Sequence, residues 1–420
     1  MTHSKKVLTL IKVGNHDQAE QELDQALTKD PAENLFELAE SLLELGFSDW
    51  ARKIYQQLLE QFPEEDQLKT SLAEIAINNG QDDQALIYLS SVKASSPAYL
   101  TALLVAADLY QTQGLFEASE HKLLLAHKIA PTETAVNFGL AELYYDMKNY
   151  RSALSFYLDL LKTGQLVIAQ VNLVQRVGAC YAESGRFEQA LGYLEQIHPE
   201  DLAPDSLFQL SFTQYELKHY EDAIKSFNKL KESVPDYTTL YPVLAAAYEQ
   251  VGQLKEALLT AQEGLRVDQY NSNLYLQASR LALKMQQADL AEKYLRQALA
   301  FDEDNLQLIT ELSKLLQQQK RFSEEIDFLK KVNQTLSDPQ LTLNLGRAYA
   351  AVEKDQAALE CYQAVQTDLA SNAAYWQELA PLARRAGNLN LAKQAVKKYL
   401  QIVPNDLEML DLQAELTDDF

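Results

Sequence analysis

The sequence predicts an all-α fold, an α-solenoid of about twelve helix–turn–helix repeats with a capping helix at its C-terminal end. Two observations lead to this prediction. A small residue recurs about every 34 residues along nearly the whole chain, and a period of roughly 20 to 50 residues is typical of solenoids and repeat arrays. In addition, the 420 residues include only 13 Gly and 11 Pro, and most of these fall at fixed distances from that small residue.

The recurring small residue, which we call the anchor of each repeat, lies in the second helix expected for that repeat. It is alanine in ten of the twelve repeats, and successive anchors are 32 to 37 residues apart, most often 34. The anchors are Ala19, Ala51, Ala85, Ser119, Ala153, Ala190, Ala223, Ala257, Ala291, Glu325, Ala358 and Ala392.

Fixed positions around the anchor predict where each helix ends and how the two helices pack. Glycine, which tolerates positive φ, stands five positions before the anchor, where the first helix must end in a tight turn: Gly14, Gly46, Gly80, Gly114, Gly185, Gly252 and Gly387. Proline, which stops the second helix, stands twelve positions after it: Pro31, Pro63, Pro97, Pro131, Pro235 and Pro404. A small residue twelve positions before the anchor lets the two antiparallel helices approach closely: Ala39, Ala73, Ala107, Ala141, Gly178, Ser211, Ala245, Ser279, Ser313, Gly346 and Ala380.

Larger side chains at helical spacing complete one apolar stripe on each helix. Tyrosine is frequent nine positions before the anchor, at Tyr110, Tyr144, Tyr181, Tyr248 and Tyr349. Four positions after the anchor come Leu23, Tyr55, Leu89, Leu123, Tyr157, Leu194, Phe227, Leu295, Leu329 and Tyr362.

This pattern resembles the tetratricopeptide repeat, whose signature is W-x2-L-G-x2-Y, then A-x3-F, then P, on a period of about 34 residues. The twelfth repeat carries the start of the signature as Trp376, Leu379 and Ala380, and the sixth carries Gly178 and Tyr181. The resemblance covers about residues 1–404. The departures are local: Val7 at the small position of the first repeat, Glu325 at the tenth anchor, and no terminal proline in repeats eight to eleven. The resemblance implies a right-handed superhelix whose first helices line a concave groove.

We expect residues 1–404 to form one continuous solenoid and residues 405–420 to form the capping helix and a tail. Asn405 or Asp406 can cap the N-terminus of that helix. The one 37-residue interval marks residues 162–168 as a possible joint, which is either a hinge or only a longer loop.

The resemblance also implies which side chains face the groove, namely those 15, 11 and 8 positions before each anchor. They comprise an acidic set, Glu40, Glu74, Asp108 and Glu142, with Phe36 nearby; an aromatic set, Phe138, Tyr145, Phe208, Phe212 and Tyr215; and a basic set, Arg280, Lys314, Arg347 and Arg384, with Lys284 and Arg385 adjacent. A groove that changes from acidic to aromatic to basic suits an extended peptide or a partner helix. The plainer interpretation is that the aromatic residues pack between repeats and that the charges are simply solvated.

Composition excludes several other classes of function. A net charge of −23 argues against binding to nucleic acid or to an anionic membrane. Two distant cysteines, Cys180 and Cys361, indicate a reducing compartment. The chain has no run of about 18 apolar residues, and its N-terminal apolar run stops at Lys12, so we expect a cytoplasmic protein. No phosphate-binding loop, Cys-x-x-Cys pair or histidine cluster occurs, and we expect no cofactor and no metal.

The leading hypothesis is a non-enzymatic scaffold of the repeat-only bacterial type that binds a protein segment or peptide in its groove. The alternative is a regulatory protein that senses a peptide and has no DNA-binding domain, since the repeats begin near residue 3. A homo-oligomer is compatible with either hypothesis.

Overall fold

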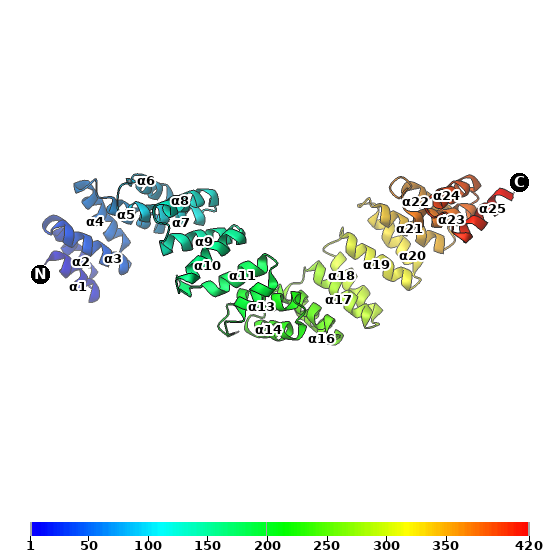
Figure 1. The fold of residues 1–420 in the computed structure, drawn as a ribbon, viewed down its shortest axis with the longest axis horizontal. Helices are drawn as coiled ribbons and strands as arrows, with labels where there is room; N and C mark the ends of the chain where they lie inside the picture. The colour runs from blue at the N-terminus through cyan, green and yellow to red at the C-terminus, as the bar shows by residue number, and fades with distance from the viewer. Residues whose placement is uncertain (1, 199, 419–420) are drawn as a thin grey trace. The chain divides into compact units, whose positions relative to one another are not determined.

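Twelve consecutive helix pairs, followed by one more helix, make up the computed structural model, which describes residues 2–198 and 200–418. In repeats one to six and eight to twelve, the first helix packs against the second helix of the same repeat, as Figure 1 shows for α7 with α8 and α23 with α24. The first helices are α1 (His3–Lys12), α3 (Ala32–Glu44), α5 (Asp66–Asn78), α7 (Tyr99–Thr112), α9 (Thr134–Asp146), α11 (Leu173–Glu183), α13 (Pro204–Glu216), α15 (Leu240–Gln250), α17 (Ser272–Lys284), α19 (Leu306–Gln318), α21 (Pro339–Ala351) and α23 (Ala373–Arg385).

The second helices carry the anchors. They are α2 (His16–Lys29), α4 (Ser48–Gln61), α6 (Asp82–Ser90), α8 (Phe116–Ile129), α10 (Tyr150–Lys162), α12 (Phe187–Leu194), α14 (Tyr220–Ser233), α16 (Leu254–Val267), α18 (Ala288–Leu299), α20 (Phe322–Val332), α22 (Asp355–Ala364) and α24 (Leu389–Ile402). The predicted all-α fold of about twelve helix–turn–helix repeats is therefore confirmed.

All twelve anchors are completely buried, which explains why this position is almost always alanine. The small residue twelve positions earlier is required because the large side chain four positions after the anchor packs on it. A Cβ atom added to Gly178 would lie 2.6 Å from Leu194, and one added to Gly346 would lie 2.9 Å from Tyr362. Close approach of the two helices thus follows from these paired positions.

The turn between the two helices has one conformation throughout. The residue five positions before the anchor has a positive φ in every repeat, at the seven predicted glycines and also at Lys148, Lys218, Gln286, Lys320 and Glu353. A left-handed residue is costly for anything but glycine. The turn geometry is therefore a property of the repeat, and five repeats adopt it without the residue that favours it.

The tenth anchor is Glu325 instead of alanine, so a carboxyl group is removed from water at this position. Glu325 is completely buried, and its Oε1 accepts hydrogen bonds from the Ser313 hydroxyl and the Gln317 amide, both at 2.6 Å. Its Oε2 has no hydrogen-bond partner among the described residues. Burial raises the pKa of this carboxyl, against the two hydrogen bonds, which lower it.

A small β-hairpin follows the fifth repeat, where the sequence has its longest interval. Strands β1 (Val167–Ile168) and β2 (Val171–Asn172) pair antiparallel, and Ala169 and Gln170 form the turn with φ of 46° and 68°. Asn172 then caps α11, because its side chain accepts from the backbone amides of residues 174 and 175. The joint proposed at residues 162–168 stays a prediction.

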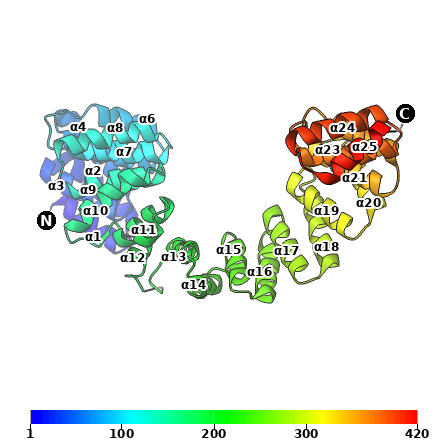
Figure 2. The ribbon, with the colours of Figure 1, turned by 45° about the vertical axis from the view of Figure 1, so that its right-hand side comes forward.

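The additional helix α25 (Leu407–Asp418) packs against α24, as Figure 2 shows. Asp406 caps it by accepting from the Met409 amide at 3.1 Å. Met409 and Leu416 are buried on its inner side, whereas Glu408, Asp411 and Glu415 are exposed.

By their internal contacts the residues cluster into two units, 1–217 and 218–420, which divide inside the seventh repeat. Within the described residues, no helix is both long enough and apolar enough to cross a membrane.

Candidate functional site

We define the first-helix face of each unit as the surface formed by side chains 15, 11 and 8 positions before the anchors. Several consecutive first helices contact each other directly, namely α1 with α3, α5 with α7, α7 with α9, α11 with α13 and, in the second unit, α19 with α21. Side chains at equivalent positions of neighbouring first helices are therefore presented side by side. This arrangement is what a row of binding residues along the repeats requires.

Three carboxylates of the predicted acidic set have no partner on this face. Glu40 on α3, Glu74 on α5 and Asp108 on α7 are exposed, and among the described residues none of them forms a hydrogen bond or an ion pair through its side chain. Although Glu74 is exposed, desolvation by the surrounding protein raises the pKa of its carboxyl. The row is thus negatively charged, and none of the described residues neutralises it through an ion pair.

Tyr55 lies beside the first two carboxylates. Its ring is buried and meets Phe36 edge to face, with the ring centroids 5.7 Å apart. Burial, together with the charges of Glu40 and Glu74 and against a hydrogen bond to Ser71, raises the pKa of Tyr55 to about 12. The Tyr55 hydroxyl therefore stays protonated and neutral. Phe36 is only half-buried, which leaves part of its ring open beside the acidic row.

The fourth carboxylate, Glu142, is engaged within the protein. It forms a bidentate pair with Arg176 of the next repeat, with Oε2 2.7 Å from Nη2 and Oε1 3.1 Å from Nε. The Tyr157 hydroxyl also donates to it. The Arg176 guanidinium in turn lies over the Tyr145 ring, 4.2 Å from its centroid. Glu142 and Tyr145 are therefore parts of a contact between repeats.

The basic set is paired in the same way, which the sequence interpretation did not anticipate. Arg280 and Lys314 share Glu311, at 3.1 Å and 3.9 Å. Arg347 makes a bidentate pair with Glu378, at 2.8 Å and 2.9 Å. Arg384 is paired with Glu415, Lys284 with Glu249, and Arg385 with Asp355. The basic character predicted from these positions is therefore largely balanced by neighbouring carboxylates.

The predicted aromatic residues are all half-buried. Phe138 packs against the core of the fourth to sixth repeats. The rings of Phe208 and Phe212 stack with centroids 6.1 Å apart, and Phe187 meets Phe212 edge to face at 6.2 Å. Tyr215 lies on the same helix, α13. These side chains thus serve packing in part and keep part of their surface open.

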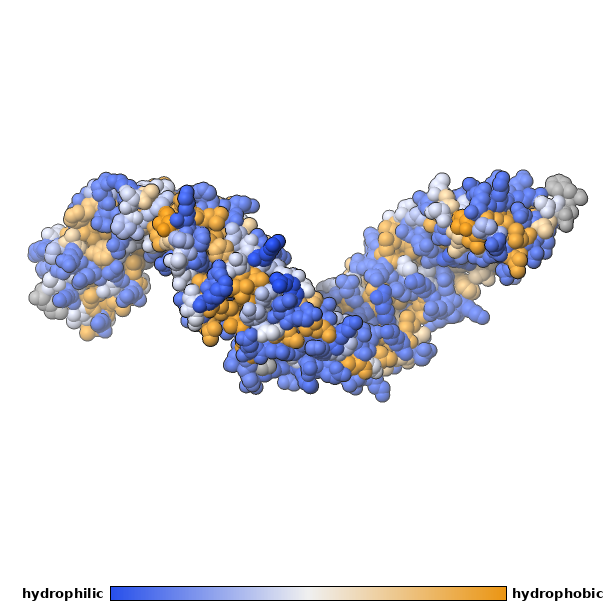
Figure 3. Space-filling model, viewed as in Figure 1, coloured by the Kyte–Doolittle hydropathy of each residue, from blue (hydrophilic) through white to orange (hydrophobic). Residues whose placement is uncertain are grey.

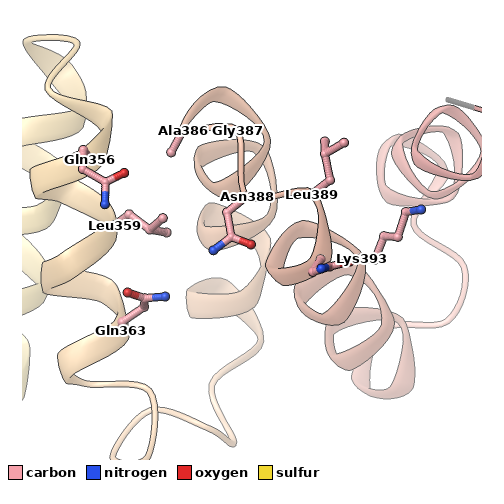
Figure 4. A pocket seen from close by; sticks show the side chains of 9 residues that line it. Gln356, Leu359, Gln363, Ala386, Gly387, Asn388, Leu389 and Lys393 are labelled. Carbon is pink, nitrogen blue, oxygen red and sulfur yellow. The ribbon is translucent and has the colours of Figure 1, made fainter.

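Two polar hollows lie in the second unit. One, of about 550 Å³, lies along α15, α17 and α19 and includes Arg280, Lys284 and Glu249 with several amide side chains. The other, of about 500 Å³, lies between α22 and the turn before α24. Figure 4 shows Gln356, Leu359 and Gln363 of α22 on one side of this second hollow and Asn388 on the other. Among the residues that the structure describes, no group of three or more His, Cys, Asp or Glu side chains could hold a metal ion.

Comparison with known proteins settles the family. Family profiles described as YpiA-like tetratricopeptide repeats and as YpiA-like C-terminal tetratricopeptide repeats match residues 111–165 and 339–406, and two general tetratricopeptide profiles match residues 205–237 and 272–305. The TPR repeat-containing protein YpiA of Bacillus subtilis (strain 168) is 30% identical over 417 residues, covering 99% of this chain and 98% of the relative. The chain belongs to the YpiA-like tetratricopeptide-repeat family. The resemblance inferred from the repeat signature is confirmed.

Two solved structures with tetratricopeptide-like folds also match. The APC/C hetero-tetramer Cut9-Hcn1 is 14% identical, with 98% of this chain and 95% of that chain covered and a TM-score of 0.34. YrrB, described as a TPR protein with an unusual peptide-binding site, is 18% identical, with 45% of this chain and 97% of that chain covered and a TM-score of 0.38. At these TM-scores neither likeness bears on the site.

Three of the partners that sequence reasoning missed occupy one tetratricopeptide position, fourteen residues before the anchor. Arg176, Glu311 and Glu378 stand there, and each pairs with the residue eleven positions before the anchor of the preceding repeat. With the repeats aligned, opposite charges at these two positions of neighbouring repeats would have predicted the ion pairs. Beside the acidic row the same position holds Ser71, Val105 and Gly139, which is why Glu40, Glu74 and Asp108 lack an ion-pair partner there.

Proposed function

We propose that this tetratricopeptide-repeat protein is a non-enzymatic, cytoplasmic scaffold and that the first-helix face of residues 1–217 binds a basic segment of a partner protein. Tetratricopeptide-repeat proteins generally act as protein-interaction scaffolds, and this chain is one of them over nearly its whole length. The observation that carries the finer proposal is the contrast between Glu40, Glu74 and Asp108, which are unpaired, and the basic set, whose members are paired.

Geometry suggests the form of the partner. Packed helices lie about 8–10 Å apart, so successive carboxylates of the row have about that spacing. An extended polyproline-type segment advances about 3.1 Å per residue, or about 9 Å per three residues. A segment with Lys or Arg at every third position therefore presents one cation to each carboxylate. The half-buried Phe36 offers an apolar contact at the end of the row.

Charge reversal tests the proposal. Glu74→Lys combined with Asp108→Lys replaces two attractions by repulsions, and we expect binding of a labelled Lys-Pro-Pro repeat peptide to weaken by at least about tenfold at low salt. Fluorescence anisotropy measures the affinity. The same double variant, used to capture partners from cell lysate, should lose the proteins that the unaltered chain retains.

The matched control is Glu20→Lys combined with Glu60→Lys, which changes the net charge equally on the exposed surfaces of α2 and α4. This control should bind the peptide within about threefold of the unaltered chain, as expected for a general change of net charge. Equal loss in both variants would reduce the acidic row to a non-specific charge effect. No loss in either would refute the proposal.

A further inference from the structure

A hollow of about 240 Å³ lies between α6, α7 and α8, on residues that the first-helix face does not use. Its lining is mixed: Leu86, Leu103 and Ala106 contribute apolar surface, and Tyr110 and Lys122 contribute polar groups. We call it the α6–α8 hollow. Hydrophobic residues are exposed over the neighbouring surface of α7 and α8, as Figure 3 shows.

Comparison with the two following repeats shows what the hollow lacks. In each of them the tyrosine nine positions before the anchor stacks on a ring three positions after it. Tyr144 stacks on Phe156 with centroids 5.9 Å apart, and Tyr181 stacks on Tyr193 at 5.5 Å. At the equivalent positions of the fourth repeat, Tyr110 is accompanied by Lys122. The α6–α8 hollow thus contains a tyrosine without its aromatic neighbour.

The adjoining second helix adds to the opening. Helix α6 has 9 residues and ends at Ser90, whereas α4 and α8 each have 14. The chain leaves α6 through a turn and a short loop before α7 begins at Tyr99. The last turn of a second helix is therefore missing where it would cover the next repeat.

Two hydrogen-bond donors of the hollow have no partner among the residues that the structure describes. The Tyr144 hydroxyl donates to Glu120 at 2.8 Å, but the residue equivalent to Glu120 beside Tyr110 is Leu86. Among the described residues, neither the Tyr110 hydroxyl nor the Lys122 ammonium forms a side-chain hydrogen bond or an ion pair. In a chain with a net charge of −23, a lysine without an ion-pair partner at the edge of this hollow is available to an external carboxylate.

We propose that the α6–α8 hollow is a second binding site, which takes an aromatic side chain of a partner protein that stands next to an Asp or Glu in the same segment. The ring would occupy the place that Phe156 and Tyr193 fill in the following repeats, stacked on Tyr110. The adjacent carboxylate would pair with Lys122 and accept from the Tyr110 hydroxyl. Aromatic anchors in apolar pockets with few polar groups are typical of such sites.

This site is separate from the proposed acidic row, and its partner has the opposite charge. A displayed library of random heptapeptides, selected on the full-length chain, tests it. We expect enrichment of peptides with Phe, Tyr or Trp beside Asp or Glu. Basic peptides enriched alone would speak for the acidic row and against the α6–α8 hollow.

Lys122→Phe should fill the hollow with the chain's own ring. Peptides with the aromatic–acidic pair should then lose binding by at least about tenfold, whereas Lys122→Gln, which removes only the charge, should weaken it about two- to fivefold. Lys128→Gln, at an exposed position of the same helix, is the matched control and should leave binding unchanged. If Lys122→Phe does not fold, Lys122→Gln still decides the matter. Failure to enrich such peptides, or equal binding by all variants, would overturn the proposal.

Discussion

Glu142 and Arg347 stand at the same position of their repeats, eleven residues before the anchor, and carry opposite charges. Each pairs with the residue fourteen positions before the next anchor, Arg176 or Glu378. A tyrosine four positions after the anchor donates to the carboxylate in both cases, Tyr157 to Glu142 and Tyr362 to Glu378. The same packing thus accepts the ion pair in either order.

Exchange of the two charges should therefore be tolerated. Arg176→Glu alone places two carboxylates beside Tyr157, and we expect it to lower the free energy of unfolding by about 2 kcal/mol, as for other broken, partly buried pairs. Adding Glu142→Arg should restore most of that loss, because repeats eleven and twelve hold the reversed pair. Urea unfolding of the two single variants and the double variant measures the coupling. Additive losses would contradict the account.

Glu325 places a carboxyl at an anchor position that is alanine or serine in the other repeats. Burial raises the pKa of its carboxyl above the ordinary 4.5, so the folded chain holds this proton to higher pH than the unfolded chain does. The stabilisation from this proton is therefore complete when the pH lies below the pKa of the unfolded state. It is lost as the pH rises through the raised pKa of the folded state.

Replacement by glutamine isolates this effect. Relative to Glu325→Gln, the unaltered chain should lose stability between pH 5 and pH 8, by at most about 1.4 kcal/mol for each pH unit over which the proton is held only by the folded state. Urea unfolding of both proteins at the two pH values measures the difference. Glu303→Gln, on an exposed turn, is the control and should show no such trend. A gap independent of pH would show that Glu325 is already ionised when folded.

At the scale of the element, the turn between paired helices is the most regular feature of the chain. The glycines predicted its position in seven repeats, but five repeats reach the same left-handed conformation with Lys, Gln or Glu. The sequence could not reveal those five turns directly, because the repeat register, and not the local residue, imposes them.

Replacing one of these residues by glycine should stabilise the fold. In Glu353→Gly the left-handed backbone, with φ of 60°, no longer crowds a Cβ atom. The gain should exceed the entropy that glycine adds to the unfolded chain and leave a net stabilisation of about 0.5 kcal/mol. Glu360→Gly, at an exposed position inside α22, should instead cost about 1 kcal/mol. Thermal unfolding compares the two, and destabilisation by both to the same extent would refute the interpretation of the turn.

Two elements lay beyond sequence reasoning for a physical reason. The β-hairpin turns through Ala169 and Gln170, both at positive φ, although such turns are typically Asn-Gly or Asp-Gly. Helix α6 ends at Ser90, ahead of the proline that predicts the end of the second helix. In both places the residue type that marks a turn or a helix end elsewhere in the chain does not stand where the chain turns or the helix ends.

At the scale of the whole molecule, the repeat period predicted the helix pairs, the buried anchors and the extra helix α25. It did not predict the ion pairs, because the groove positions were considered one repeat at a time while each pair joins two repeats. The predicted change from acidic to basic positions is present in the sequence. The basic positions, however, are largely neutralised by ion pairs such as those with Glu311 and Glu378. Among the predicted groove positions, the charges without a partner are therefore those of Glu40, Glu74 and Asp108.

Site-specific photocrosslinking in living cells tests this central claim most directly. A photoreactive phenylalanine derivative replaces Glu74 in one protein and Lys314 in another, and the crosslinked partner peptides are sequenced. We predict adducts from position 74 whose partner segment is rich in Lys and Arg, and none from position 314. Adducts from position 314 with none from position 74, or adducts at position 74 through acidic segments, would contradict the account.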